Sequence, residues 1–89
     1  MEREEFERAV LALSVAAEIR PESPYVWYSL ARAHARAGSE GLAVKALRRA
    51  VDNGLSDVGQ LKENPDLKSL QDREEFLELL AEMAQKREQ

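Results

Sequence analysis

The stretch AVLALSVA, residues 9–16, returns in closely similar form as AVKALRRA, residues 43–50. Three matched pairs lie at a constant separation of 34 residues: Ala9 with Ala43, Leu13 with Leu47, and Ala16 with Ala50. A fixed period of this size is typical of stacked helical hairpins, in which each period forms one supersecondary unit. The sequence therefore predicts a helical repeat protein.

Apolar residues in both copies follow the spacing of an amphipathic helix. In the first copy they are Phe6, Ala9, Val10, Leu13, Ala16 and Ala17. In the second copy they are Leu42, Ala43, Ala46, Leu47, Ala50 and Val51. Between the copies, Ser23-Pro24 predicts a helix start with a hydroxyl cap, and Gly38 predicts a left-handed helix end. We expect helices over 3–20 and 24–37, and a third from a Ser39 cap to Asn53-Gly54.

Residues 55–89 lack this regular pattern, and we expect an irregular closing segment. A short helix is predicted from Ser56 to Leu61, and Asn64-Pro65-Asp66 predicts a turn. Asp72, with Glu75 three residues later, resembles the capping box of a last helix. The apolar residues expected on the inner face of that helix are Phe76, Leu79, Leu80, Met83 and Ala84. No strand is predicted, so residues 1–89 form one all-α domain.

Composition narrows the classes of function. The chain has 89 residues, which is enough for one small domain with a thin core. Its net charge of −4 argues against nucleic acid as a partner, and no apolar run approaches the ~20 residues that span a membrane. The absence of cysteine excludes disulfides and thiol chemistry. The charged N-terminal residues lack an apolar signal core, so we expect a cytoplasmic protein without a membrane partner.

The 24–54 hairpin resembles the tetratricopeptide repeat family. The residues that carry the resemblance are Trp27, Leu30, Ala31, His34, Ala43, Leu47 and Ala50, with Pro21 closing the preceding half-repeat. Four positions depart from the family pattern. Ala31 stands where the family has Gly, and His34 stands where it has an aromatic residue. Leu47 takes the place of Phe, and Leu55 takes the place of the closing Pro. The resemblance implies antiparallel hairpins stacked as a short α-solenoid with a C-terminal capping helix. It also implies that Trp27 lies in the core.

The resemblance further implies a function, because in this family the first helix of each hairpin lines a concave groove that receives peptides. By register, the residues facing this groove are Tyr25, Tyr28, Ser29, Arg32, Ala35 and Arg36. Arg32 and Arg36 are one helical turn apart, so two guanidinium groups beside Tyr28 suit a carboxylate. We expect the partner to be a peptide or a protein, and an acidic partner would suit the two arginines. The open alternative is that both arginines only pair with nearby glutamates on a solvated face.

No set of residues supports catalysis or a bound group. His34 is the only histidine and takes the place of a structural aromatic residue. Gly38 and Gly41 lack the lysine of a phosphate-binding loop. The glutamates at both ends are typical of solvated helix faces rather than metal ligands: Glu2, Glu4, Glu5, Glu7, Glu74, Glu75 and Glu78. We expect no enzyme activity, no cofactor and no metal.

The first predicted helix corresponds to the second helix of a repeat, so its partner helix is missing. We expect these residues to be the C-terminal piece of a longer array, because stacked repeats need about three units for stability. Weak self-association through the uncovered first helix follows as a corollary. Two other functions stay open: a structural cap that ends an array, and the regulatory tail of a larger enzyme.

Overall fold

The computed structural model describes residues 2–88 and contains only helices joined by short connections. In order they are α1 (Glu2–Ile19), α2 (Pro24–Arg36), α3 (Glu40–Asp52), α4 (Val58–Glu63), the 3-10 helix η1 (Pro65–Leu70) and α5 (Glu74–Glu88). None of the described residues forms a strand. The predicted all-α class is therefore confirmed. None of these helices has the length and apolar character needed to cross a membrane.

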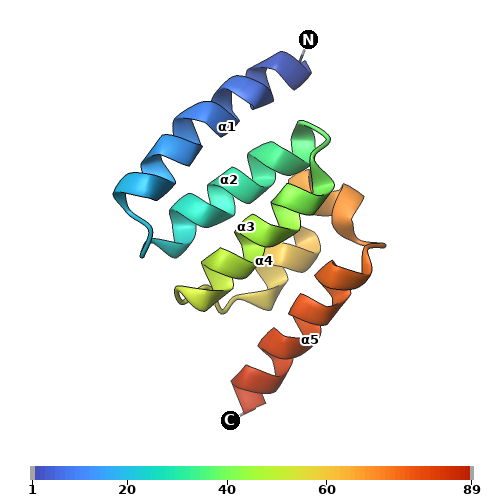
Figure 1. Ribbon diagram of the computed structural model, residues 1–89. Helices are drawn as coiled ribbons and strands as arrows, with labels where there is room; N and C mark the ends of the chain where they lie inside the picture. Colours follow the sequence, from blue (N-terminus) through green and yellow to red (C-terminus); the bar gives the residue numbers. More distant parts are fainter. Residues whose placement is uncertain (1, 89) are drawn as a thin grey trace.

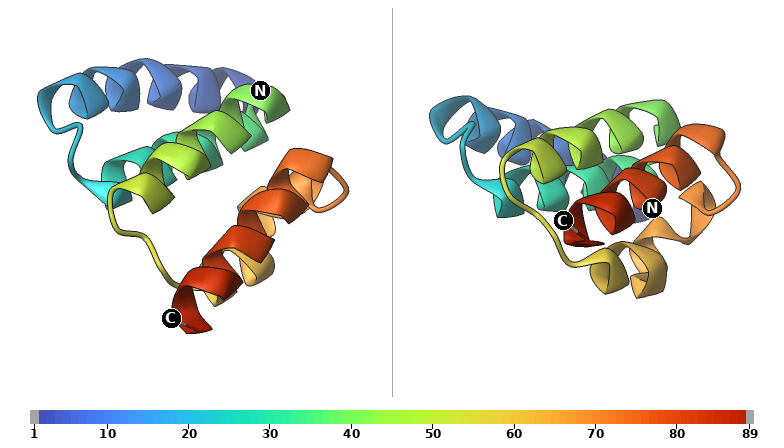
Figure 2. Two further views of the ribbon diagram at one scale, coloured as in Figure 1. Left: turned by 60° about the horizontal axis from the view of Figure 1, so that its bottom comes forward. Right: turned by 90° about the horizontal axis from the view of Figure 1, so that it is seen from below.

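The helices follow one another in three layers (Figure 1; Figure 2, left). The first layer is α1, the second is the hairpin of α2 and α3, and the third contains α4, η1 and α5. α1 packs against α2, while the third layer reaches α2 through η1 and α3 through α5. The hairpin therefore has helices on both sides, whereas α1 lies at one end of the molecule.

Glycines end the two helices of the hairpin. Gly38 has a φ of 89° and Gly54 a φ of 119°, a left-handed range that residues with a Cβ rarely adopt. Both helix ends were predicted from these glycines. The predicted side-chain caps were wrong: Ser23 and Ser39 stand at the N-cap positions, but neither hydroxyl makes a capping hydrogen bond. At Ser23, Pro24 stands at the first helical position, where its missing N–H is one of those that have no partner within the helix.

The core lies around the α2–α3 hairpin and extends into the third layer. Ala31, Ala43 and Ala50 are completely buried where α2 and α3 come close, as their predicted roles require. The largest fully buried side chains are Leu47 of α3 and five residues of the closing segment: Leu61, Leu67, Leu70, Phe76 and Leu79. Burial of large apolar side chains is the main stabilising contribution to folding. The closing segment is thus part of the core and holds the hairpin from one side.

Three predictions about the core need correction. Leu42, which was expected on the apolar side of α3, is 51% exposed. Trp27 is only half-buried, packed against the edge of the core rather than within it. Its indole Nε1 donates a hydrogen bond of 2.7 Å to the Pro21 carbonyl, and the Arg49 guanidinium lies over the ring, 5.2 Å from its centre. Ala84 is exposed because the buried stripe of α5 is narrow, formed by Phe76, Leu79 and Met83 with Leu80 partly covered.

The Asn64-Pro65-Asp66 segment begins a 3-10 helix where a simple turn was predicted. The Asn64 side-chain oxygen accepts a hydrogen bond of 2.8 Å from the Asp66 backbone N–H, so Asn64 caps η1. Leu67 and Leu70, on the inner side of η1, are completely buried. Because these leucines anchor η1, Asp66 is held in a defined position beside α2. The last helix begins at Glu74, two residues after the predicted start at Asp72.

Candidate interaction surface

The two arginines predicted to bind a partner's carboxylate hold a carboxylate of the same chain. Arg32 donates from Nε to Oδ2 of Asp66 at 3.0 Å, and its Nη2 lies 3.0 Å from the same oxygen in an ion pair. Arg36 donates from Nη1 to Oδ1 of Asp66 at 2.7 Å. The one-turn spacing on α2 brings both guanidinium groups to one carboxylate. The alternative that these arginines form internal pairs is thus the arrangement observed, with an aspartate of η1 in place of a nearby glutamate.

Two opposing effects act on the pKa of Asp66. Partial burial works to raise it, while the hydrogen bonds and positive charges of Arg36 and Arg32 lower it, and together the arginines prevail. The pKa of Asp66 therefore lies below its ordinary value, and the carboxylate is charged at neutral pH. Two cations and one anion leave this cluster with a net positive charge.

Tyr28 lies beside Arg32 as predicted, with the guanidinium 5.8 Å from the centre of its ring, but its side chain is covered rather than open. It is only 8% exposed, and its hydroxyl donates to the Gln60 carbonyl oxygen at 3.1 Å. The same hydroxyl accepts a bond of 2.6 Å from Nδ2 of Asn64. Tyr28 therefore fastens α2 to α4 and to the cap of η1. Ala35 is buried as well, whereas Tyr25 is exposed and Ser29 half-buried.

A hollow of about 340 Å³ remains between α1 and α2, beside the arginine pair. Its lining combines an apolar floor with polar groups at one end: Phe6, Ala9, Leu13, Ser29, Arg32, Ala33 and Asp66. The Arg36 guanidinium lies over the Phe6 ring, 4.7 Å from its centre, so α1 and the arginine pair share this edge. An apolar hollow bounded by a few placed polar groups can receive a side chain of a partner.

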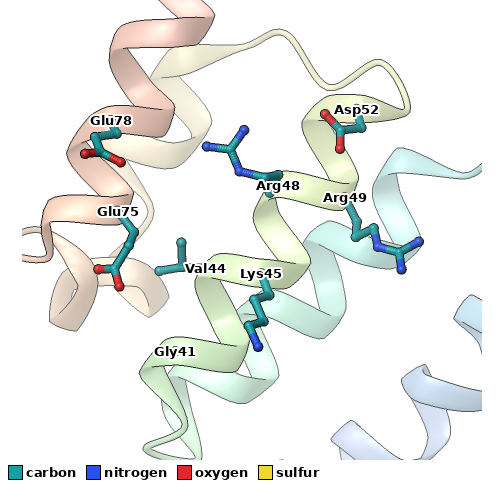
Figure 3. A pocket seen from close by; sticks show the side chains of 8 residues that line it. All are labelled: Gly41, Val44, Lys45, Arg48, Arg49, Asp52, Glu75 and Glu78. Carbon is teal, nitrogen blue, oxygen red and sulfur yellow. The ribbon is translucent and has the colours of Figure 1, made fainter.

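A second hollow, of about 520 Å³, lies between α3 and α5 (Figure 3). Glu75 and Glu78 line it on α5, and Lys45 and Arg48 line it on α3. Arg48 makes two parallel bonds to Glu82, of 3.0 and 3.1 Å, which raise the pKa of Arg48 and lower that of Glu82. Charges of both signs line this hollow, and the ion pair of Arg48 with Glu82 connects α3 to α5. We interpret these charges as a polar seam between α3 and α5.

Neither His34 nor the acidic residues form a reactive cluster in the described part of the chain. His34 lies half-buried on α2, and burial lowers its pKa. Glu75 and Glu40 both lie near Arg73, at 3.6 and 3.3 Å from its guanidinium nitrogens. No group of three or more His, Cys, Asp or Glu side chains within the described residues is placed to hold a metal ion.

Comparison with known proteins adds no family assignment. No protein-family model matches the sequence, and no curated protein or solved structure gives a significant match.

Sequence reasoning found Arg32 and Arg36 but missed their partner Asp66. The two arginines were recognisable from their spacing on one helix. Asp66 lies 34 and 30 residues further along the chain, beyond any helical periodicity. The only local signal was Asn64-Pro65, which is compatible with the cap of η1 but says nothing about what faces Asp66.

Proposed function

We propose that this protein is a non-catalytic interaction module that binds a peptide segment of a partner protein in the hollow between α1 and α2. The observation that carries the proposal is the combination, in one hollow, of an apolar floor with an arginine pair at its edge. The 34-residue repeat supports it, because the tetratricopeptide resemblance assigns peptide binding to a face of α2 that includes Ser29 and Arg32, which both line the hollow. The proposal includes a cytoplasmic location.

The partner segment proposed here carries an apolar side chain next to a carboxylate. The apolar side chain would occupy the floor formed by Phe6, Ala9 and Leu13. The carboxylate would meet Arg32 and Arg36, whose side chains remain nearly half exposed although both contact Asp66. A guanidinium group has five N–H donors, so each arginine keeps donors that Asp66 does not use. A second carboxylate can therefore bind beside Asp66 or replace it.

The test uses an array of labelled 12-residue peptides that vary the number of apolar and acidic residues. We expect the protein to retain peptides with both kinds of residue and to lose at least tenfold in affinity in the double variant Arg32→Ala, Arg36→Ala. The matched control is Lys45→Ala with Lys62→Ala, which removes two exposed cations from α3 and α4 and should leave binding unchanged. Circular dichroism confirms that each variant stays folded.

Asp66→Asn sharpens the test because it removes the internal competitor. If a partner carboxylate uses the arginine pair, acidic peptides should bind several-fold tighter to this variant, while peptides without acidic residues should be unaffected. Equal binding of both peptide classes by wild type and variant would exclude the arginine pair as the contact site. An array in which the wild type retains no peptide would exclude the proposed function.

The structure of the closing segment favours one second candidate, a structural cap. Phe76, Leu79 and Met83 of α5 and Leu67 and Leu70 of η1 cover the apolar side of the hairpin. A segment that ends a repeat array needs an apolar inner side of this kind and a polar outer side. In this alternative, other repeats of the array would bind the partner. A wild-type array without retained peptides would favour it.

A further inference from the structure

The helix α1 has an apolar stripe on the side that faces away from α2. Leu11, Val15 and Ile19 are 70%, 56% and 72% exposed. Their spacing of four residues places them on one side of the helix, opposite Leu13 and Ala17, which face α2. The other large exposed apolar residues, Tyr25, Leu42 and Leu77, are single residues on three different helices. Scattered apolar residues are normal on a protein surface, whereas three in one row indicate a contact.

Charged residues of opposite sign bound this stripe. Arg8 lies one turn before Leu11, while Glu18 stands near its far end and Glu22 follows Ile19. All three side chains are exposed, and none of them forms an ion pair with another described residue. The nearby Glu7 is already within 3.9 Å of Arg3. Next to the apolar residues, the stripe thus has Arg8 at one end, with Glu4 one turn further out, and Glu18 and Glu22 at the other.

We propose that this face binds the same face of a second copy of the chain, with the two α1 helices antiparallel across a two-fold axis near Val15. In this arrangement Leu11 lies opposite Ile19 of the second copy, and the two Val15 side chains meet at the axis. Arg8 then lies beside Glu18 and Glu22 of the second copy, and by symmetry this contact occurs twice. A parallel arrangement would instead place Arg8 beside Arg8, which is unfavourable.

The contact should be weak and reversible. An 18-residue helix is about 27 Å long, and one helix pair buries less than the about 800 Å² per partner of a stable interface. We expect a dissociation constant on the order of 100 µM. The face lies on the side of α1 opposite the hollow described above. The dimer therefore does not depend on the proposed peptide binding and can form whether or not that hollow is occupied.

Sedimentation velocity over a concentration series tests the dimer directly. We expect the mean mass to rise from monomer toward dimer as the protein concentration approaches 1 mM. Val15→Glu, which places two charges at the axis, should keep the protein monomeric, whereas the equally exposed Leu77→Glu on α5 should not. A wild type that stays monomeric throughout would overturn the proposal and indicate that another protein segment covers this face.

Charge reversal tests the antiparallel orientation. Arg8→Glu should weaken the dimer at least fivefold, and so should Glu18→Arg combined with Glu22→Arg. The triple variant restores opposite charges at both ends and should return to within about twofold of the wild type. A triple variant as weak as the partial ones would overturn this arrangement. Circular dichroism verifies that α1 remains helical in each variant.

A single thiol tests the position of the axis, because the chain has no cysteine of its own. Val15→Cys should form a covalent dimer under mild oxidation at least tenfold faster than Leu77→Cys on α5. Comparable rates would show that the two Val15 positions do not meet, and the proposed axis would be wrong.

Discussion

The helices α1 and α3 share an Ala, Leu and Ala at the same spacing, yet these residues are buried to different extents in the two helices. In α3, Ala43, Leu47 and Ala50 are completely buried, whereas their counterparts Ala9, Leu13 and Ala16 in α1 are half-buried. The difference comes from the neighbours. α3 lies between α2 and the closing segment, while α1 packs mainly against α2. A repeated pattern therefore specifies which face of a helix is apolar, and the adjacent layers determine how far that face is removed from water.

The largest effect on stability is expected when the matched leucines, Leu47 and Leu13, are each replaced by alanine. Leu47→Ala should lower the free energy of unfolding by about 3–4 kcal/mol, because it leaves a cavity in a closed part of the core. Leu13→Ala should cost roughly 1–2 kcal/mol, since part of that side chain already contacts water. Urea denaturation followed by circular dichroism measures both values. Equal losses would mean that α1 and α3 are equally covered in solution.

Replacing the matched alanines, Ala50 and Ala16, with leucine should also change stability more in α3 than in α1, but by a smaller amount. Ala50→Leu should cost about 1–3 kcal/mol, because the added atoms must separate α3 from α2. Ala16→Leu should change stability by less than about 0.5 kcal/mol, since the α1 side chain can turn toward solvent. Thermal melting of the two variants distinguishes the sites. A larger loss at Ala16 would reverse the comparison.

The Asp66 cluster links the layer that covers α3 to α2, and its contribution should depend on pH. The folded state lowers the pKa of Asp66, so this stabilisation is present above the unfolded value near 3.8 and is lost as the pH falls through the lower folded value. At pH 7, Asp66→Asn should lower the free energy of unfolding by at most about 1 kcal/mol, because both arginines are partly solvated.

The measurement compares the wild type and Asp66→Asn by urea denaturation at pH 7 and at pH 2.5. The difference between the two proteins should be smaller at the lower pH, because the folded-state carboxylate begins to take up protons there. A difference that stays constant between these pH values would show that the charge of Asp66 does not stabilise the fold.

The smallest predicted effect concerns a hydrogen bond between α1 and the residue that follows α2. Arg3 donates from Nε to the Ala37 carbonyl oxygen at 3.1 Å, where the last carbonyls of α2 favour a cation. Arg3→Ala should cost a few tenths of a kcal/mol to about 1 kcal/mol. In Arg3→Ala, the backbone amides in the first turns of α1 should exchange hydrogen faster than in the wild type, whereas those of α3 should not. Arg8→Ala serves as the control, and equal exchange in both variants would contradict this role.

The parts of the fold that were predicted correctly depend on local chemistry. Helix spacing, the left-handed glycines at positions 38 and 54, and the small residues at the α2–α3 contact can all be recognised within a few residues of sequence. The errors concern contacts between distant segments. Trp27 was expected in the core, but its ring lies at the edge, where Arg49 covers it and Pro21 accepts its N–H.

In the candidate site too, local features were predicted from the sequence, whereas contacts between distant segments were not. The spacing of Arg32 and Arg36 predicted a pair of guanidinium groups suited to a partner's carboxylate, and in the structure the pair instead holds a carboxylate of the same chain. That it belongs to Asp66 depends on the anchoring of η1 by Leu67 and Leu70. Tyr28 was assigned to the open surface because of its register on α2, but α4 and Asn64 cover it.

The sequence by itself determined the principal helices, where the hairpin ends, and the main apolar side of each of these helices. These properties follow from backbone dihedral preferences and from periodicity along one helix. Only the tertiary structure decided that α3 would be enclosed and α1 left half covered, and that Asp66 would neutralise part of the arginine pair. Burial and charge pairing are set by neighbours far away in sequence, and no local pattern specifies where those neighbours will lie.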